Sequence, residues 1–161
     1  MSQPLDALTK SLLHAAEKAG ADAADAKAVR ATSISVDVRQ GALEQAERSE
    51  NIDIGLRVFV GYRSATVSAS DISDRTIATM AERAVAMAKE APEDPHAGLA
   101  DPDQLAQSWN LDALELCDPS AEPSPATLQA DATEAEAAAS AGQGVTQVQS
   151  ASAGYGAQQI H

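Results

Sequence analysis

The sequence predicts an α+β fold, a mainly antiparallel sheet with helices packed on it, and two patterns carry this prediction. Apolar side chains recur at every second position over residues 52–60, the period of a strand with one buried face. Helical spacing, or helix start and stop signals, mark residues 4–19, 73–90 and 125–141. Strands joined by short turns pair antiparallel, because parallel neighbours need long crossover connections.

The clearest strand pair is a hairpin within residues 52–71. Its first strand carries the alternating apolar residues Ile52, Ile54, Leu56, Val58 and Val60. Gly61 and Tyr62 interrupt this run before a weaker alternation resumes at Ala65. A glycine turn between two alternating runs is typical of a β-hairpin. Tyr62 and Arg63 then lie at its tip, where turn geometry explains them as well as contact with a partner does.

Two further strands are predicted upstream of this hairpin. Ile34, Val36 and Val38 alternate with polar residues, and Gly41 separates them from a polar run at 43–49. A polar strand belongs at a sheet edge or along a solvated groove. The chain therefore has four candidate antiparallel strands in sequence.

The first helix is predicted over residues 4–19 and is followed by a turn at 20–26. Pro4 suits the first turn of a helix, and Gly20 suits the stop. His14 lies opposite the leucines of the helical stripe, so we expect an exposed histidine and not a ligand.

The second helix, 73–90, has clear signals at both ends. Ser73 or Asp71 can cap its start, and Pro92 stops it. Met80 and Met87 lie beside its apolar stripe, and we expect both to fill the core.

The third helix, 125–141, is rich in alanine. Ser124 and Pro125 open it, and Gly142 closes it. We expect Glu134 and Glu136 to point outward.

A connector rich in Pro, Asp and Gly occupies residues 91–110. Loops of this length are uncommon unless they pack on a surface or shape a site. We expect it to be anchored by Leu99, Leu105, Trp109 and Leu111. The chain then divides into an N-terminal α+β domain, 1–110, and a region, 111–161, holding a connector, a helix and the start of a further β region. Its polar last strand has no predicted partner on one edge, so we expect the front part of a longer protein.

The net charge of −13 is unevenly distributed along the 161 residues. All eleven Lys and Arg lie between Lys10 and Lys89, whereas residues 90–161 contain twelve Asp and Glu. Direct binding to a nucleic-acid backbone needs clustered cations, so this pattern argues against it. A solvated acidic half that favours solubility is the simpler interpretation, and an acidic surface for a basic partner is the alternative.

The composition favours a cytoplasmic protein without a membrane segment. The single Cys117 excludes an internal disulfide and suits a reducing compartment. Residues 1–6 have neither the basic nor the apolar region of a signal peptide. No apolar run approaches the roughly 20 residues that span a bilayer.

No catalytic or cofactor-binding residue is predicted. The sequence has no phosphate-binding loop, nucleophile elbow or dinucleotide fingerprint, and none of its three histidines is followed by Glu. Cys117 has no basic neighbour in sequence to lower its pKa, so we expect a buried or inert thiol.

One acidic cluster is a candidate divalent-cation site. It comprises Glu93, Asp94, His96, Asp101 and Asp103. Their oxygen and imidazole groups are suitable ligands. Asp and Pro are also ordinary turn residues, and we prefer a capped, proline-rich turn. We therefore predict no metal site in this chain.

The order of these signals resembles the N-terminal part of the TldD/PmbA family, also called the modulator of DNA gyrase family, and more narrowly its PmbA (TldE) branch. The matching motifs are Val38-Arg39-Gln40-Gly41 with Glu44, Gly55-Leu-Arg-Val-Phe-Val-Gly61, Ala65-Thr-Val-Ser-Ala-Ser-Asp71, the helix from Ser73 and Glu93-Asp-Pro-His-Ala-Gly-Leu-Ala-Asp101. The likeness covers about residues 5–160.

The resemblance implies a cytosolic two-subunit zinc protease. Its TldD-type subunit carries a zinc-binding His-Glu-x-x-x-His helix, and the PmbA-type subunit is a partner without a working copy of that motif. The pair acts on unfolded peptides. No catalytic residue is carried over to this chain, and zinc is expected in the partner subunit. The alternative function, from charge alone, is an acidic interaction module that modulates a basic or nucleic-acid-binding partner such as gyrase.

Overall fold

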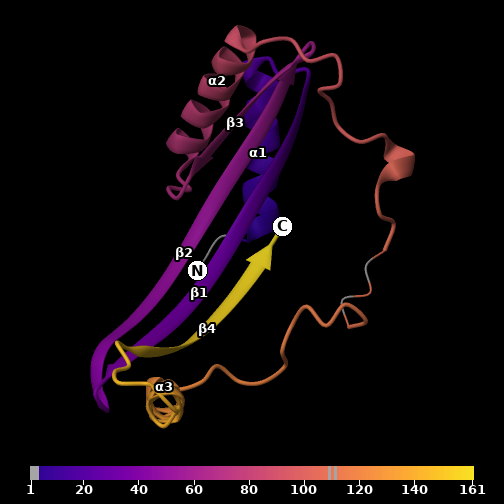
Figure 1. The fold of residues 1–161 in the computed structure, drawn as a ribbon. Helices are drawn as coiled ribbons and strands as arrows, with labels where there is room; N and C mark the ends of the chain where they lie inside the picture. The colour runs from indigo at the N-terminus through magenta and orange to yellow at the C-terminus, as the bar shows by residue number, and fades with distance from the viewer. Residues whose placement is uncertain (1–3, 109, 111) are drawn as a thin grey trace. The chain divides into compact units, whose positions relative to one another are not determined.

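The computed structural model describes residues 4–108, 110 and 112–161 (Figure 1). Its elements are α1 (Leu5–Ala19), β1 (Ala23–Arg39), β2 (Ala42–Val60), β3 (Arg63–Ala69), α2 (Asp74–Glu90), a short 3₁₀ helix (Pro102–Gln104), α3 (Pro125–Ser140) and β4 (Ala151–Ile160). The strands form one antiparallel sheet in the order β3-β2-β1-β4. The predicted α+β class is therefore confirmed.

The chain forms two compact units built from interleaved segments. Unit 1 contains residues 1–30, 51–109 and 159–161, and unit 2 contains 31–50 and 110–158. β1, β2 and β4 each contribute residues to both units. The linear division of the chain at residue 110 into two domains stays a prediction.

Two strands are longer than their sequence patterns predict. β1 begins at Ala23, so residues 23–26 are strand and the predicted turn at 20–26 is wrong for them. β2 runs unbroken from Ala42 to Val60, so the predicted strands 43–49 and 52–60 are one strand. Glu50 and Asn51 are part of this strand, so the backbone continues extended between the polar and apolar halves.

The polar half of β2 is an edge even though β2 is interior in the strand order. β3 pairs with β2 in the register Ile54 opposite Ala69 to Val60 opposite Arg63. Residues 42–53 consequently have a strand neighbour only on the β1 side within the described chain. This location agrees with the exposure of Ala42–Asn51 and with the polar sequence.

The core of unit 1 lies between its helices and the apolar half of β2. Leu8 and Leu12 of α1 are fully buried with Leu56 of β2. α2 packs against both α1 and β3 and adds Ile77 and several alanines to the same cluster. Met80 is buried as predicted, but Met87 is 47% exposed, so its predicted core role is wrong.

Unit 2 has a smaller core with no large aromatic cluster. Ile34, Val36 and Val38 of β1 pack with Leu128 and Ala132 of α3, and the partly buried Ala153 and Tyr155 of β4 join them. Apolar burial is the main stabilising term in folding, so these few contacts hold α3 to the strands.

The connector is not anchored by the leucines expected to hold it. Leu99 is 46% exposed and Leu105 is 56% exposed, so that prediction is wrong for both. Trp109 and Leu111 lie outside the described residues. Polar contacts hold the described part instead: the N–H of Asp94 donates to the Tyr62 carbonyl at 2.8 Å, and Asp101 and Gln104 form a capping box.

The start of α2 is fixed by a small hydrogen-bond network. The Ser73 hydroxyl caps the helix by accepting from the Thr76 N–H at 3.3 Å. The Asp71 carboxylate accepts from the Thr76 hydroxyl, and from the N–H and the hydroxyl of Ser73 at 3.0 Å each. These hydrogen bonds, the one from Thr76 foremost, lower the pKa of Asp71.

Asp71→Asn should therefore destabilise unit 1 in a pH-dependent way. Because folding lowers this pKa, the ionised carboxylate stabilises the folded state above the unfolded pKa of about 3.9. That contribution is lost as the pH falls through the lower folded pKa. In urea unfolding at pH 7, the free energy of unfolding should be higher for wild type than for Asp71→Asn. This difference should become smaller below pH 4. Asp131→Asn, which removes an exposed carboxylate from α3, controls for net charge. An equal difference between wild type and Asp71→Asn at pH 7 and pH 3 would contradict this account.

Candidate functional site

A buried glutamate of α3 binds the turn that joins β1 to β2. Glu136 accepts from the Gln40 N–H through Oε1 at 2.6 Å and from the Gly41 N–H through Oε2 at 2.7 Å. Its side chain is only 7% exposed. Hydrogen bonds to an ionised carboxylate are shorter and stronger than those between neutral groups. We call this arrangement the Glu136 clamp.

The turn is suited to bind an anion. Gln40 has φ 53° and Gly41 has φ 74°, and positive φ at both loop residues is the requirement of a type I′ hairpin turn. Glycine adopts this conformation freely, whereas a side chain such as that of Gln40 makes it less favourable. Consecutive backbone N–H groups in a tight turn form a concave site for negative charge. The Glu136 carboxylate fills that site and stabilises the turn.

The prediction that Glu136 points outward is wrong, whereas Glu134 is exposed as expected. The signal for burial is present in the sequence. Leu128, Ala132 and Glu136 are spaced by four, so they lie on one face of α3. An acid in line with two buried apolar residues indicates that its charge has a partner.

A cavity of about 340 Å³ lies beside the Glu136 clamp. It is bounded by the turn, by Thr133, Ala137 and Ser140 of α3, and by Gln147 and Val148. Glu136 is the one ionisable side chain among the lining residues, and both of its oxygens accept from the backbone. The cavity thus has no free acid–base pair for catalysis.

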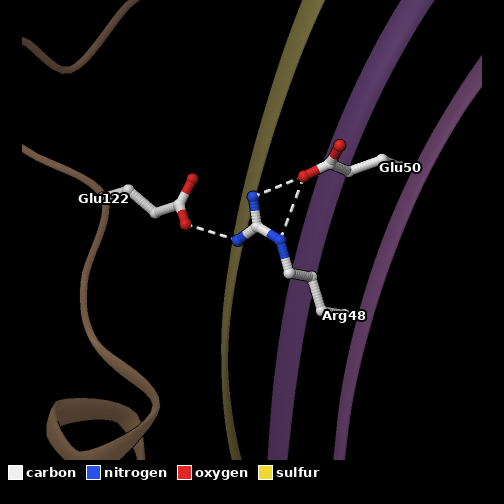
Figure 2. A network of polar contacts seen from close by, with 3 residues as sticks. All are labelled: Arg48, Glu50 and Glu122. Atoms are coloured by element: carbon white, nitrogen blue, oxygen red, sulfur yellow. Dashed lines mark hydrogen bonds and ion pairs between the residues drawn. The ribbon is translucent and has the colours of Figure 1, made fainter.

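A second polar network joins β2 to the segment before α3 (Figure 2). Arg48 donates to Glu50 Oε1 through Nε at 3.0 Å and through Nη2 at 2.6 Å. Its Nη1 donates to Glu122. The hydrogen bonds to Glu122 and then Glu50 raise the pKa of the Arg48 guanidinium. All three side chains are substantially exposed, so the network positions Glu122 more than it stabilises the fold.

Comparison with known proteins identifies the family of this chain. Residues 24–88 match the family described as PmbA/TldA metallopeptidase domain 1. The chain is 34% identical over 101 residues to the metalloprotease PmbA homolog of Haemophilus influenzae, covering 63% of this chain and 22% of that protein. It is also 34% identical over 118 residues to metalloprotease PmbA of Escherichia coli O157:H7, covering 73% of this chain and 26% of that protein. The chain belongs to the PmbA/TldE family.

Solved structures share the fold of this PmbA/TldE family chain. TldE from Thermococcus kodakarensis matches with a TM-score of 0.70 at 17% identity, over 96% of this chain and 34% of that one. A putative modulator of DNA gyrase from Bacteroides thetaiotaomicron matches with a TM-score of 0.65 at 17% identity, over 96% and 35% of the two chains. The chain spans about a quarter of the length of the curated relatives it matches.

The metal that the family name implies finds no fitting ligand set in the described part of this chain. No three His, Cys, Asp or Glu side chains there are grouped so as to hold a metal ion. Within the candidate cation cluster, Glu93 pairs with Arg63 at 3.2 Å, and Asp94 accepts from the His96 N–H at 2.9 Å. Asp101 caps the short 3₁₀ helix. These contacts are those of capped turns.

The other candidate residues from the sequence are exposed or form hydrogen bonds with neighbouring elements. Cys117 is exposed, so of the two alternatives expected for it, a buried or an inert thiol, the buried one is wrong and the inert one stays a prediction. Arg63 donates to the Lys89 carbonyl at 2.6 Å, whereas Tyr62 beside it is 61% exposed. His14 is exposed, as predicted. None of the helices in residues 4–108, 110 and 112–161 has the length and apolar content needed to cross a bilayer.

Removing the Glu136 carboxylate should loosen the hairpin turn. Glu136→Gln keeps the size of the side chain but replaces one acceptor oxygen with an N–H donor that faces a backbone N–H. Leaving a buried donor unsatisfied costs about 1–3 kcal/mol, and the loss should appear in urea unfolding. Hydrogen exchange at the Gln40 and Gly41 amides should also become faster. The exposed Glu134→Gln on the same helix is the matched control and should change neither. Equal behaviour of the two variants would show that the clamp does not stabilise the turn.

Proposed function

We propose that the chain is the N-terminal region of a PmbA/TldE-type, non-catalytic subunit in a TldD/TldE-type zinc metallopeptidase complex. The observation that carries the proposal is the family match at residues 24–88, which extends from the start of β1 through most of α2. The sequence identity to two bacterial PmbA metalloproteases supports it. The subunit would act in the cytoplasm, in line with the lone Cys117.

In this proposal the partner subunit supplies the chemistry. A zinc ion would be held by a His-Glu-x-x-x-His helix of the TldD-type subunit and would supply the Lewis-acid chemistry for peptide hydrolysis. No step of the reaction is assigned to a residue of this chain, because its described residues have no metal-ligand group and the cavity beside Glu136 has no free acid–base pair.

This chain would contribute a surface along which an unfolded peptide is held. An extended peptide can add to a sheet edge through main-chain hydrogen bonds, which read little of its sequence. The polar, exposed half of β2 and the edge strand β4 are surfaces of this kind. Broad acceptance of unfolded peptides follows from recognition through the backbone.

A second candidate function rests on charge. The segments of unit 2, 31–50 and 110–158, contain eleven Asp and Glu but only two Arg. Such a surface favours a basic protein partner and disfavours direct contact with nucleic acid. The chain would then be an acidic interaction module that modulates a basic or nucleic-acid-binding protein such as gyrase.

Co-purification separates the two functions. The tagged chain, co-expressed with the TldD-type protein of the same genome, should recover it in equal amounts. Hydrolysis of an unstructured peptide should need both proteins, should stop with a zinc chelator and should return with added zinc. Each protein alone is the control. Recovery of a basic protein with no TldD-type subunit would instead favour the acidic interaction module, and hydrolysis by this chain alone would contradict its non-catalytic role.

A further inference from the structure

Glu136 carries a buried negative charge that no cation of unit 2 neutralises. The segments of unit 2 contain no Lys and no His. Their two arginines, Arg39 and Arg48, form ion pairs with other glutamates. A buried carboxylate is costly unless it is paired or hydrogen-bonded. Within unit 2, the charge of Glu136 is therefore offset only by the two backbone N–H groups of the clamp.

The clamp uses half of the hydrogen-bonding capacity of this carboxylate. A carboxylate offers about four lone-pair positions. The N–H groups of Gln40 and Gly41 occupy one position on each oxygen. Glu136 also lines the cavity of about 340 Å³ beside the turn. A donor that enters this cavity can therefore add a hydrogen bond to each oxygen.

The other polar residues of the cavity wall are neutral and can accept hydrogen bonds. Gln40 and Gln147 have side-chain amides, and Thr133 and Ser140 have hydroxyls. The Thr133 hydroxyl donates to the Gln129 carbonyl at 2.8 Å, so toward a ligand it can act only as an acceptor. A positively charged group with several N–H donors matches this combination of one carboxylate and neutral acceptors.

The backbone of Gln40 indicates that its side chain serves the cavity. A type I′ turn favours Asn, Asp or Gly at its loop positions, yet Gln40 is held there at φ 53°. Residues in such unfavourable conformations cluster at ligand-binding and active sites. The turn itself does not require a glutamine, whereas an amide in the cavity wall adds an acceptor for a ligand.

We propose that the cavity beside Glu136 binds a guanidinium group, either on an arginine side chain of another polypeptide or on a small free compound. A guanidinium is planar, has five N–H donors and no acceptor, and pairs with a carboxylate through two parallel hydrogen bonds. A lysine ammonium has fewer donors and is more strongly hydrated, so it suits this cavity less well. The volume is near the lower end of the range for ligand pockets, which suits a group of this size. The inference is independent of both proposed functions, because it concerns only the residues of this cavity.

Calorimetric titration of the chain at low ionic strength compares three probes. Nα-acetylarginine N-methylamide presents the guanidinium on a blocked amino acid. The corresponding citrulline compound has nearly the same shape but no charge, and methylguanidinium is the free group. The arginine compound should bind at least roughly tenfold more tightly than the citrulline compound, because hydrogen bonds to a charged group are the stronger ones.

Methylguanidinium distinguishes the two sources of the group. Affinity equal to that of the arginine compound would assign the cavity to a small free compound, and several-fold weaker affinity would assign it to an arginine side chain. Equal binding of the arginine and citrulline compounds, or no binding of either guanidinium probe, would overturn the proposal.

Three variants test whether the probe binds at this cavity. Gln40→Gly keeps the backbone N–H and relieves the unfavourable conformation, so the free energy of unfolding should not fall. The same variant should weaken binding of the arginine compound roughly fivefold, because one acceptor is lost. Glu136→Gln should weaken binding at least roughly tenfold. Glu134→Gln removes the same charge from an exposed position of α3 and should bind as wild type does.

Two results with these variants would overturn the proposal. Equal losses of affinity in Glu134→Gln and Glu136→Gln would show general charge attraction in place of a site. Unchanged affinity in Gln40→Gly, which is expected to remain folded, would show that the probe does not contact the wall of this cavity.

Discussion

The carboxylate of Glu136 is the constraint on which unit 2 depends. It is the one buried charged side chain among the residues that the structure describes, and it accepts from two consecutive backbone N–H groups. A buried charge is tolerated only when it is paired or hydrogen-bonded. Separating α3 from the β1–β2 turn would break two charge-assisted hydrogen bonds. The turn in its place fixes where β1 ends and β2 begins.

The small core of unit 2 explains why its stability depends on the hydrogen bonds of Glu136. The whole chain has one Trp, one Phe and two Tyr, so its cores are built mainly from aliphatic residues and alanine. Unit 1 gathers many of these between two helices and the apolar half of β2. Unit 2 has only five buried apolar residues among those described, so the two charge-assisted hydrogen bonds of the clamp supplement a modest apolar contribution.

The sequence predicts the helices well because their ends carry local chemistry. Ser73 and Ser124 cap α2 and α3 as expected, and Gly20 takes the left-handed conformation after α1. Strand limits depend on pairing with distant residues. Glu50 and Asn51 have a turn-like composition, yet they continue β2, and the alanines from Ala23 onward have low strand propensity, yet they begin β1. The partner of Glu136 could not be predicted, because Gln40 and Gly41 lie about a hundred residues away.

Native mass spectrometry of the chain mixed with a TldD-type protein tests the central proposal, that this PmbA/TldE family member is the non-catalytic half of a zinc peptidase. The account predicts a one-to-one pair with a single zinc ion, and the zinc should remain with the partner when the pair is dissociated in the gas phase. Zinc that remains with this chain, or two proteins that stay separate under conditions where each is folded, would contradict it.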